Sequence, residues 1–406
     1  MAFMTEGSVT SPTGFTTGVA AAGIKKADRP DVALLFASRP CSAAALFTRN
    51  QVVAAPVILD RRTLAANNAA IHAVVANSGN ANACTGDQGL ENAHQMQRLT
   101  AAACGCAPEQ VLVLSTGVIG VQLPMAKIEH GIQDAANSLS ATAGMAAAKA
   151  IMTTDTVPKS AAVRIDLPGG MVTIGGMAKG AGMIHPDMAT LLGVHTTDAL
   201  NAPALHDQLL RIAVDQSYNR ISVDGDTSTN DTVLLLANGA SGIEVADEES
   251  IRRFQAGLTE LATYLAQQIV RDGEGASKFV AIHVVGAVDD TAAHQIANTI
   301  ATSALVKTAF AGSDANWGRI LAAAGRAGVP FDQAQTALWV GVTEPRSLQL
   351  LDGGTPTSYR EEDAAAVFAE PAFEVLFELQ QGPGRAVVWT SDLTHEYVSI
   401  NADYRT

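Results

Sequence analysis

The residue of greatest chemical interest in this sequence is Thr190, because of the segment around it. A threonine hydroxyl is a weak nucleophile until a base takes its proton, so its surroundings decide whether it reacts. Glycines crowd residues 169–193, including the pairs Gly169-Gly170 and Gly175-Gly176, which predicts tight turns and close backbone approach. Thr190 follows Ala189 and precedes an apolar run. From these residues alone, Thr190 is interpreted as a buried threonine that begins a strand.

Standard catalytic motifs are missing elsewhere in the chain. There is no P-loop, no dinucleotide-binding glycine motif after a strand, no H-E-x-x-H and no G-x-S-x-G, and the nine histidines lack metal-ligand spacing. Residues 224–231 imitate the start of a calcium loop, but Thr229 replaces its glycine and Leu235 its bidentate glutamate. We therefore expect no metal site, and we interpret residues 224–231 as a hydrogen-bonded turn before a strand.

The glycine-rich segment 176–193 resembles the self-cleavage site of the ornithine acetyltransferase family, the bifunctional glutamate N-acetyltransferases. The resemblance extends along nearly the whole chain, because eight further segments match the family in the same order. These are residues 47–50, 77–83, 115–120, 151–156, 224–231, 272–275, 312–319 and 400–406. Nine separated matches are stronger evidence than any single motif, and they favour a nucleophilic Thr190 over a merely buried one.

The resemblance implies that the chain cuts itself between Ala189 and Thr190. The Thr190 hydroxyl would attack the Ala189 carbonyl, and hydrolysis of the resulting ester would free Thr190 as a new N-terminus. A threonine in that position carries its own base, because its α-amine has a pKa near ~8 and is partly neutral at pH 7. A serine–histidine–aspartate arrangement is then not required.

The resemblance also implies roles for other residues. Thr116 and Gly117, expected just after a buried strand at residues 111–114, match the oxyanion-hole pair of the family. The residues that match its substrate contacts are Thr153, Lys179, Thr190, Glu274, Asn401 and Thr406. As hypotheses of our own, Glu274 lies near an ammonium or a transferring proton and Lys179 near a carboxylate. Thr406, the last residue, would have to fold back into the site.

The activity implied is a ping-pong transfer of acetyl through Thr190. The donor is N2-acetylornithine, the acceptor is glutamate, and the products are ornithine and N-acetylglutamate. No cofactor is expected, and the sequence leaves open whether acetyl-CoA also serves as a donor. One alternative is an amidase or aminopeptidase that passes the acyl group from the same threonine to water. A second is a non-catalytic metabolite-binding protein with an uncleaved chain.

The elements that must position these residues alternate between strand and helix. Strands are predicted at residues 31–36, 73–76, 111–114, 232–237 and 279–285, and helices at 88–103, 203–215 and 248–271. This alternation indicates an α/β protein, and the resemblance implies a layered α-β-β-α sandwich. It also implies an alpha chain of residues 1–189 and a beta chain of residues 190–406, which form one site and assemble as an α2β2 heterotetramer.

Composition narrows the class of protein and its partners. The 406 residues are 48% hydrophobic and 16% charged with a net charge of −14, so a compact globular protein is expected and nucleic acid or an anionic membrane is a poor partner. No signal peptide or membrane span is predicted, which favours the cytoplasm. Four cysteines are too few for a disulfide scaffold, and the pair Cys104 and Cys106 is interpreted as ordinary thiols in preference to a metal site.

Overall fold

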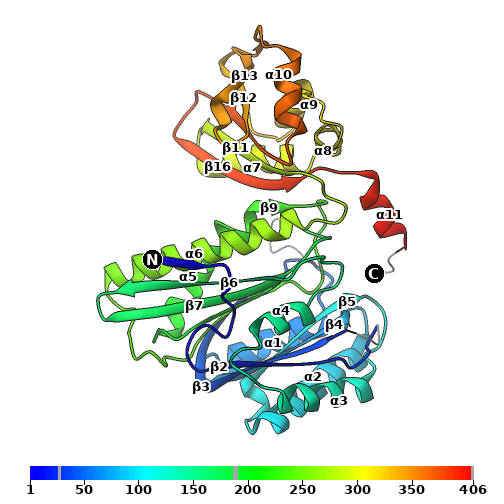
Figure 1. Ribbon diagram of the computed structural model, residues 1–406, viewed down its shortest axis with the longest axis vertical. Coiled ribbons are helices and arrows are strands. Elements are labelled where there is room, and N and C mark those ends of the chain that lie inside the picture. The colour runs from blue at the N-terminus through cyan, green and yellow to red at the C-terminus, as the bar shows by residue number, and fades with distance from the viewer. Residues whose placement is uncertain (26–28, 186–190, 404–406) are drawn as a thin grey trace.

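The strands of the computed structural model, which describes residues 1–25, 29–185 and 191–403, form two sheets (Figure 1). In the described chain the larger sheet has nine strands in the order β1-β6-β7-β8-β10-β3-β4-β5, with β2 paired to β3. Their bounds are β1 Ala2–Met4, β2 Phe15–Ala20, β3 Val32–Phe47, β4 Ile71–Asn80, β5 Val111–Val118, β6 Lys159–Leu167, β7 Gly170–Lys179, β8 Leu192–Thr197 and β10 Thr232–Ala237.

The larger sheet folds over so that its two halves face each other, with helices outside both halves (Figure 1). The outer face of β3, β4 and β5 packs on α1 Ala55–Ala66, α2 Gly86–Cys104 and α3 Met125–Asn137. The outer face of β6, β7 and β10 packs on α5 Pro203–Asp215 and α6 Glu248–Arg271. Between the halves lies a third core, which includes α4 Gly144–Ala150. This is the predicted α-β-β-α sandwich.

Side-chain alternation along the strands builds these layers. In β4, Val74 and Ala76 lie in the core between the sheet halves, whereas Ala73 and Val75 pack against the outer helices. All four are buried, because the strand is covered on both faces. The apolar runs of the sequence therefore mark strands enclosed on both sides.

The smaller sheet is a part of the fold that the sequence did not predict. It has the order β14-β13-β12-β15-β11-β16-β9 in the described residues, with β9 Ile221–Ser222, β11 Phe279–Ala287, β12 Ala337–Gly341, β13 Leu348–Asp352, β14 Thr355–Pro356, β15 Ala372–Glu378 and β16 Gly384–Ser391. Of the described helices, four pack on this sheet and form its core together with the strands: α7 Asp290–Ala301, α8 Ala304–Ala311, α9 Trp317–Gly325 and α10 Glu361–Ala369. Helix α11 His395–Asp403 follows β16 in the chain and lies to the right of β9 in the view of Figure 1.

The predicted cut falls between two strands of one sheet. β8 and β10 follow residue 190 in the chain, yet they lie between β7 and β3, which precede it. Lys179 of β7 pairs with Leu192 of β8, and Thr232 of β10 pairs with Phe47 of β3. Two fragments cut at this point would therefore share a continuous hydrogen-bonded sheet.

Most expected elements are present, and two expectations need correction. The bounds of α5, α6 and β10 agree with the sequence-based ranges, whereas β5 continues beyond residue 114 to Val118. The pair Gly175-Gly176 lies within β7 and not in a turn, but the predicted close backbone approach is present, since a Cβ atom on Gly175 would lie 2.1 Å from the Ser8 carbonyl oxygen. In the part of the chain that the structure describes, no helix is long and apolar enough to cross a membrane.

Candidate active site

A cavity of about 250 Å³ brings together predicted site residues from distant parts of the chain. Its wall includes Thr116, Gly117, Thr153, Lys179, Glu274 and Asn401. These residues come from β5, the loop after α4, the end of β7, the loop after α6, and α11. The predicted cleavage residues Ala189 and Thr190, and the predicted substrate contact Thr406, lie outside the described residues.

Gly117 lies in β5 and not in a loop after it, which corrects the expected strand-to-loop turn. Its φ of +135° is unfavourable for other residues. A Cβ atom built on Gly117 would lie 2.3 Å from the carbonyl carbon of Gly79 in the neighbouring strand β4. Glycine is therefore needed for β4 and β5 to stay paired where Thr116 and Gly117 meet the cavity.

The Thr116 hydroxyl has a buried cation beside it. Lys179, which is 3% exposed, donates a hydrogen bond from Nζ to Thr116 Oγ1 at 3.2 Å. A hydroxyl can accept two hydrogen bonds and donate one, so accepting from Lys179 leaves the Thr116 proton for another acceptor. Burial lowers the pKa of Lys179, an effect opposed chiefly by the carboxylate of Asp155 and also by that of Glu274.

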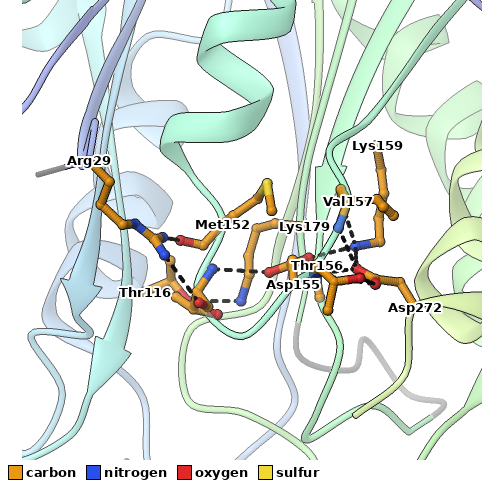
Figure 2. A network of polar contacts seen from close by, with 11 residues as sticks. Arg29, Thr116, Met152, Asp155, Thr156, Val157, Lys159, Lys179 and Asp272 are labelled. Atoms are coloured by element: carbon orange, nitrogen blue, oxygen red, sulfur yellow. Dashed lines mark hydrogen bonds and ion pairs between the residues drawn. The ribbon is translucent and has the colours of Figure 1, made fainter. Parts of the chain in front are cut away.

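A buried network of charges lies next to Lys179 (Figure 2). Lys159 Nζ donates to Asp155 Oδ1 at 2.7 Å and to Asp272 Oδ2 at 2.6 Å. Asp155 Oδ1 also accepts from the Gly180 N–H at 2.6 Å. Burial alone would raise the pKa of Asp155, but the charges of Lys159 and Lys179 and these hydrogen bonds lower it to about 2. Asp155 therefore carries a negative charge at neutral pH.

The backbone of Thr153 is hydrogen-bonded through both its N–H group and its carbonyl oxygen. Its N–H donates to Asp155 Oδ2 at 3.0 Å. The Arg29 guanidinium donates to the carbonyl oxygens of Met152 and Thr153 from the other side (Figure 2). The position of Thr153 at the cavity wall is thus set by two charged side chains.

The Glu274 carboxylate lies at the cavity wall, against the backbone of Gly182. The Glu274 N–H donates to the Ala181 carbonyl at 2.8 Å, and a Cβ atom on Gly182 would lie 2.4 Å from the Glu274 carboxyl carbon. Asn401 Nδ2 donates to Glu274 Oε2 at 2.8 Å. Only glycine at position 182 therefore lets the carboxylate approach, and α11 brings Asn401 to the same carboxylate.

An acidic wall completes the cavity, and the sequence did not predict its role. Residues 224–231 form the expected hydrogen-bonded turn, in which the Asp226 N–H donates to Asp224 Oδ1. Asp224 also accepts from the Met183 and Ile184 N–H groups at 2.5 and 2.8 Å, and Tyr397 Oη donates to it at 3.3 Å. Burial raises the pKa of Asp224 to about 6. The signal available in the sequence was the polar run of residues 224–231, which has three aspartates among eight residues.

Asp231 anchors the residue that follows Thr190 in the sequence. Its Oδ1 accepts from the Leu191 N–H at 3.0 Å. Asp231 is 1% exposed, and its Oδ2 has no hydrogen-bond partner within the described chain. Burial raises the pKa of this carboxyl well above its usual value. The chain is thereby fixed at the C-terminal side of the predicted nucleophile.

Metal chemistry finds no support in the described part of the chain. No group of three or more histidine, cysteine, aspartate and glutamate side chains there could hold an ion. Burial and the neighbouring Cys106 raise the pKa of Cys104 to about 12, so without a metal ion this thiol stays protonated at neutral pH.

Comparison with known proteins decides the family. The sequence profile of the ArgJ family matches residues 16–406. The chain belongs to the ArgJ family. The arginine biosynthesis bifunctional protein ArgJ of Symbiobacterium thermophilum is 49% identical over 405 residues, which cover 98% of this chain and 99% of that protein. The ArgJ protein of Parasynechococcus marenigrum is 47% identical over 403 residues, or 99% and 96% of the two chains.

Solved ArgJ structures match part of this chain. The ArgJ protein of Bacillus halodurans is 37% identical with a TM-score of 0.49, covering 52% of this chain and 98% of that one. The ornithine acetyltransferase of Mycobacterium tuberculosis, complexed with ornithine, is 40% identical with a TM-score of 0.43, covering 46% and 97%. ArgJ membership confirms the expected enzyme class, glutamate N-acetyltransferase (ornithine acetyltransferase) of arginine biosynthesis.

Proposed function

We propose that this chain cuts itself between Ala189 and Thr190 and then transfers acetyl from N2-acetylornithine to glutamate through Thr190. The observation that carries the proposal is the meeting of Thr116, Gly117 and Lys179 with Glu274 and Asn401 around one cavity. The first three precede the proposed cut and the last two follow it. The proposed fragments, residues 1–189 and 190–406, would both be needed to build this site.

The proposed cleavage is an acyl shift followed by hydrolysis. Thr190 Oγ attacks the Ala189 carbonyl carbon, the peptide C–N bond breaks, and the hydroxyl proton passes to the new Thr190 amine. Water then hydrolyses the Ala189 ester and restores the hydroxyl. The hydrogen bond from the Leu191 N–H to Asp231 supports this step, since it holds the chain beside the reacting bond.

The proposed transfer uses the same hydroxyl with the free α-amine as base. Thr190 Oγ attacks the acetyl carbonyl of N2-acetylornithine, the amide C–N bond breaks, and the α-amine returns its proton to the departing ornithine. Glutamate then attacks the acetyl ester through its neutral amine and leaves as N-acetylglutamate, and Thr190 Oγ regains a proton. In each half, Thr116 and Gly117 would donate to the oxyanion.

Two charged regions of the cavity suit the proposed donor. Asp224, Asp226 and Glu274 provide a negative wall for the δ-ammonium. Lys179 donates a hydrogen bond to Thr116, so it would strengthen Thr116 as the oxyanion donor. This role is additional to the contact with the substrate carboxylate that we predicted for Lys179. Unchanged binding of N2-acetylornithine in Glu274→Gln and Lys179→Met would exclude the substrate roles of both side chains.

Ornithine release is the assay that tests the transferase proposal. The purified protein is incubated with N2-acetylornithine, with and without glutamate. Glutamate-dependent release of ornithine with matching N-acetylglutamate is the expected result. Equal release without glutamate would show an amidase, and no release would favour a binding protein. Replacing N2-acetylornithine with acetyl-CoA and measuring N-acetylglutamate and free CoA decides whether the second donor is used. Sedimentation of the cleaved protein tests the proposed α2β2 assembly.

A further inference from the structure

Lys159 is a buried cation that is not among the residues lining the candidate cavity, and the proposed reaction gives it no role. It lies at the start of β6, and its side chain and that of Asp155 are 0% exposed. Asp272, its second partner, has a side chain that is 4% exposed. A charge this deeply buried costs free energy unless it is paired. Lys159 is paired twice, at 2.7 Å to Asp155 and 2.6 Å to Asp272.

Each carboxylate of this triad also fixes a segment of the cavity wall. Asp155 accepts from the N–H groups of Thr153 and Gly180, at 3.0 and 2.6 Å. Asp272 accepts from the Thr156 N–H at 3.0 Å and from the Thr156 hydroxyl. Asp272 is also two residues from Glu274 in the loop that follows α6. Figure 2 shows Lys159 between Asp155 and Asp272. Through these contacts the triad connects the backbone of Thr153 with the loop that carries Glu274.

We propose that Lys159 is a positioning residue of the acyl-transfer site, which holds Thr153 and Glu274 at the separation that one donor molecule requires. This inference rests on the proposed function. The physical basis is that Asp155 and Asp272 carry like charges. Among the described residues, Lys159 is the one side chain that is hydrogen-bonded to both carboxylates. Without that bridge, the two carboxylates repel each other or take up a proton, and the segments that they hold move apart.

The triad also crosses the proposed cut. Lys159 and Asp155 precede residue 190, whereas Asp272 follows it. In a cleaved molecule the Lys159–Asp272 pair would be a buried ion pair between two chains, directly behind the substrate cavity. Thr116 and Gly117 are held in β5 by pairing with β4, whereas the Thr153 N–H is held by Asp155 of the triad, so the oxyanion donors depend less on the triad than Thr153 does. Loss of Lys159 should therefore weaken donor binding more than the chemical step.

The test is a comparison of KM with kcat. Lys159→Met, Lys159→Arg and Asp272→Asn are measured for glutamate-dependent ornithine release per folded molecule, with Tm recorded for each. We expect Lys159→Met to raise KM for N2-acetylornithine by at least about tenfold, as a misplacement near 1 Å can do, with a smaller effect on kcat. Asp272→Asn should move KM in the same direction, and Lys159→Arg should recover part of the loss because it keeps the charge.

A core truncation far from the cavity serves as the control for lost stability. Leu338 in β12 is 1% exposed and belongs to the core of the smaller sheet. Leu338→Ala should lower Tm and leave KM unchanged. If KM stays within about twofold of the wild type in Asp272→Asn and in any folded Lys159→Met, while Tm falls, the triad is purely structural and the inference is overturned. Absence of transfer by the wild-type protein is a different outcome, which would refute the proposed function itself.

Discussion

Lys179 and Thr116 are joined by a hydrogen bond of 3.2 Å that links the end of β7 to β5 at the wall of the cavity. The ammonium donates and the hydroxyl oxygen accepts, so the hydroxyl proton is left to point at a substrate oxygen. Lys179 is buried, and its charge strengthens the hydroxyl as a donor because a charge acts more strongly away from water. The pair therefore behaves as one donor, and it can be tested at Thr116.

Thr116→Val should remove that donor with little change in shape. We expect kcat to fall by about 10² to 10³, as for loss of one oxyanion donor in a studied protease, with a small change in KM. Steady-state kinetics of ornithine release measure both. Thr116→Ser keeps the hydroxyl and should retain most activity. A Thr116→Val protein with wild-type kcat would rule out the oxyanion role.

Asp231 should control the rate of self-cleavage through Leu191. Asp231→Ala removes the acceptor of the Leu191 N–H and should slow fragment formation by about tenfold or more, since the reacting bond loses its orientation. Because burial raises the pKa of Asp231, the neutral Asp231→Asn is its close mimic and should cleave nearly normally. Denaturing electrophoresis over time after synthesis follows the reaction. Equal cleavage rates in all three proteins would show that this anchor is dispensable.

Asp224 should cause kcat/KM to rise with pH at the acidic end of the pH profile, which forms the acidic limb of that profile. Its pKa is raised by burial to about 6, so the carboxylate becomes charged as pH rises through that value. A donor with a δ-ammonium should bind better to the charged form, and kcat/KM for N2-acetylornithine should rise through about pH 6. Asp224→Asn should abolish this limb, whereas Asp226→Asn, at an exposed position, should keep it. A limb that persists in Asp224→Asn would assign it to another group.

Lys307 of α8 should make the protein more stable as pH rises above neutrality. Burial lowers its pKa from 10.5 to about 7, so between these values the unfolded chain binds more protons than the folded one. The free energy of unfolding should then increase by about 2 kcal/mol from pH 7 to 9 on account of this residue. Urea unfolding of Lys307→Met should lack the increase, and exposed Lys149→Met should retain it. An unchanged slope in Lys307→Met would contradict this assignment.

Local patterns explain which parts of the fold could be predicted. Helix α6 has an apolar stripe and begins at Glu248, directly after Asp247, whose carboxylate accepts from the Ser250 N–H. Residues next to one another in the sequence therefore determine where this helix begins. The end of β5 is different: Ser115, Thr116 and Gly117 do not look like a strand, but pairing with β4 makes them one. Tertiary neighbours decided that boundary, and no local signal carried it.

The site shows the same division. Family resemblance indicated Thr153, Lys179 and Glu274, and the structure brings them to one cavity. Asp155 and Asp272 lie in segments that match the family, but the resemblance did not indicate that Lys159 joins them, because Lys159 lies outside those segments and is 113 residues from Asp272. Long-range ion pairs of this kind become visible only when the chain is folded. The roles of Thr190, Ala189 and Thr406 stay predictions of the sequence.

Mass spectrometry of the purified protein tests the central claim most directly. The account predicts a fragment that begins at Thr190 and one that ends at Ala189, together with an intact 41.9 kDa chain and no ornithine release in Thr190→Ala. A wild-type protein that transfers acetyl from N2-acetylornithine to glutamate while every molecule remains an uncut 41.9 kDa chain would contradict it.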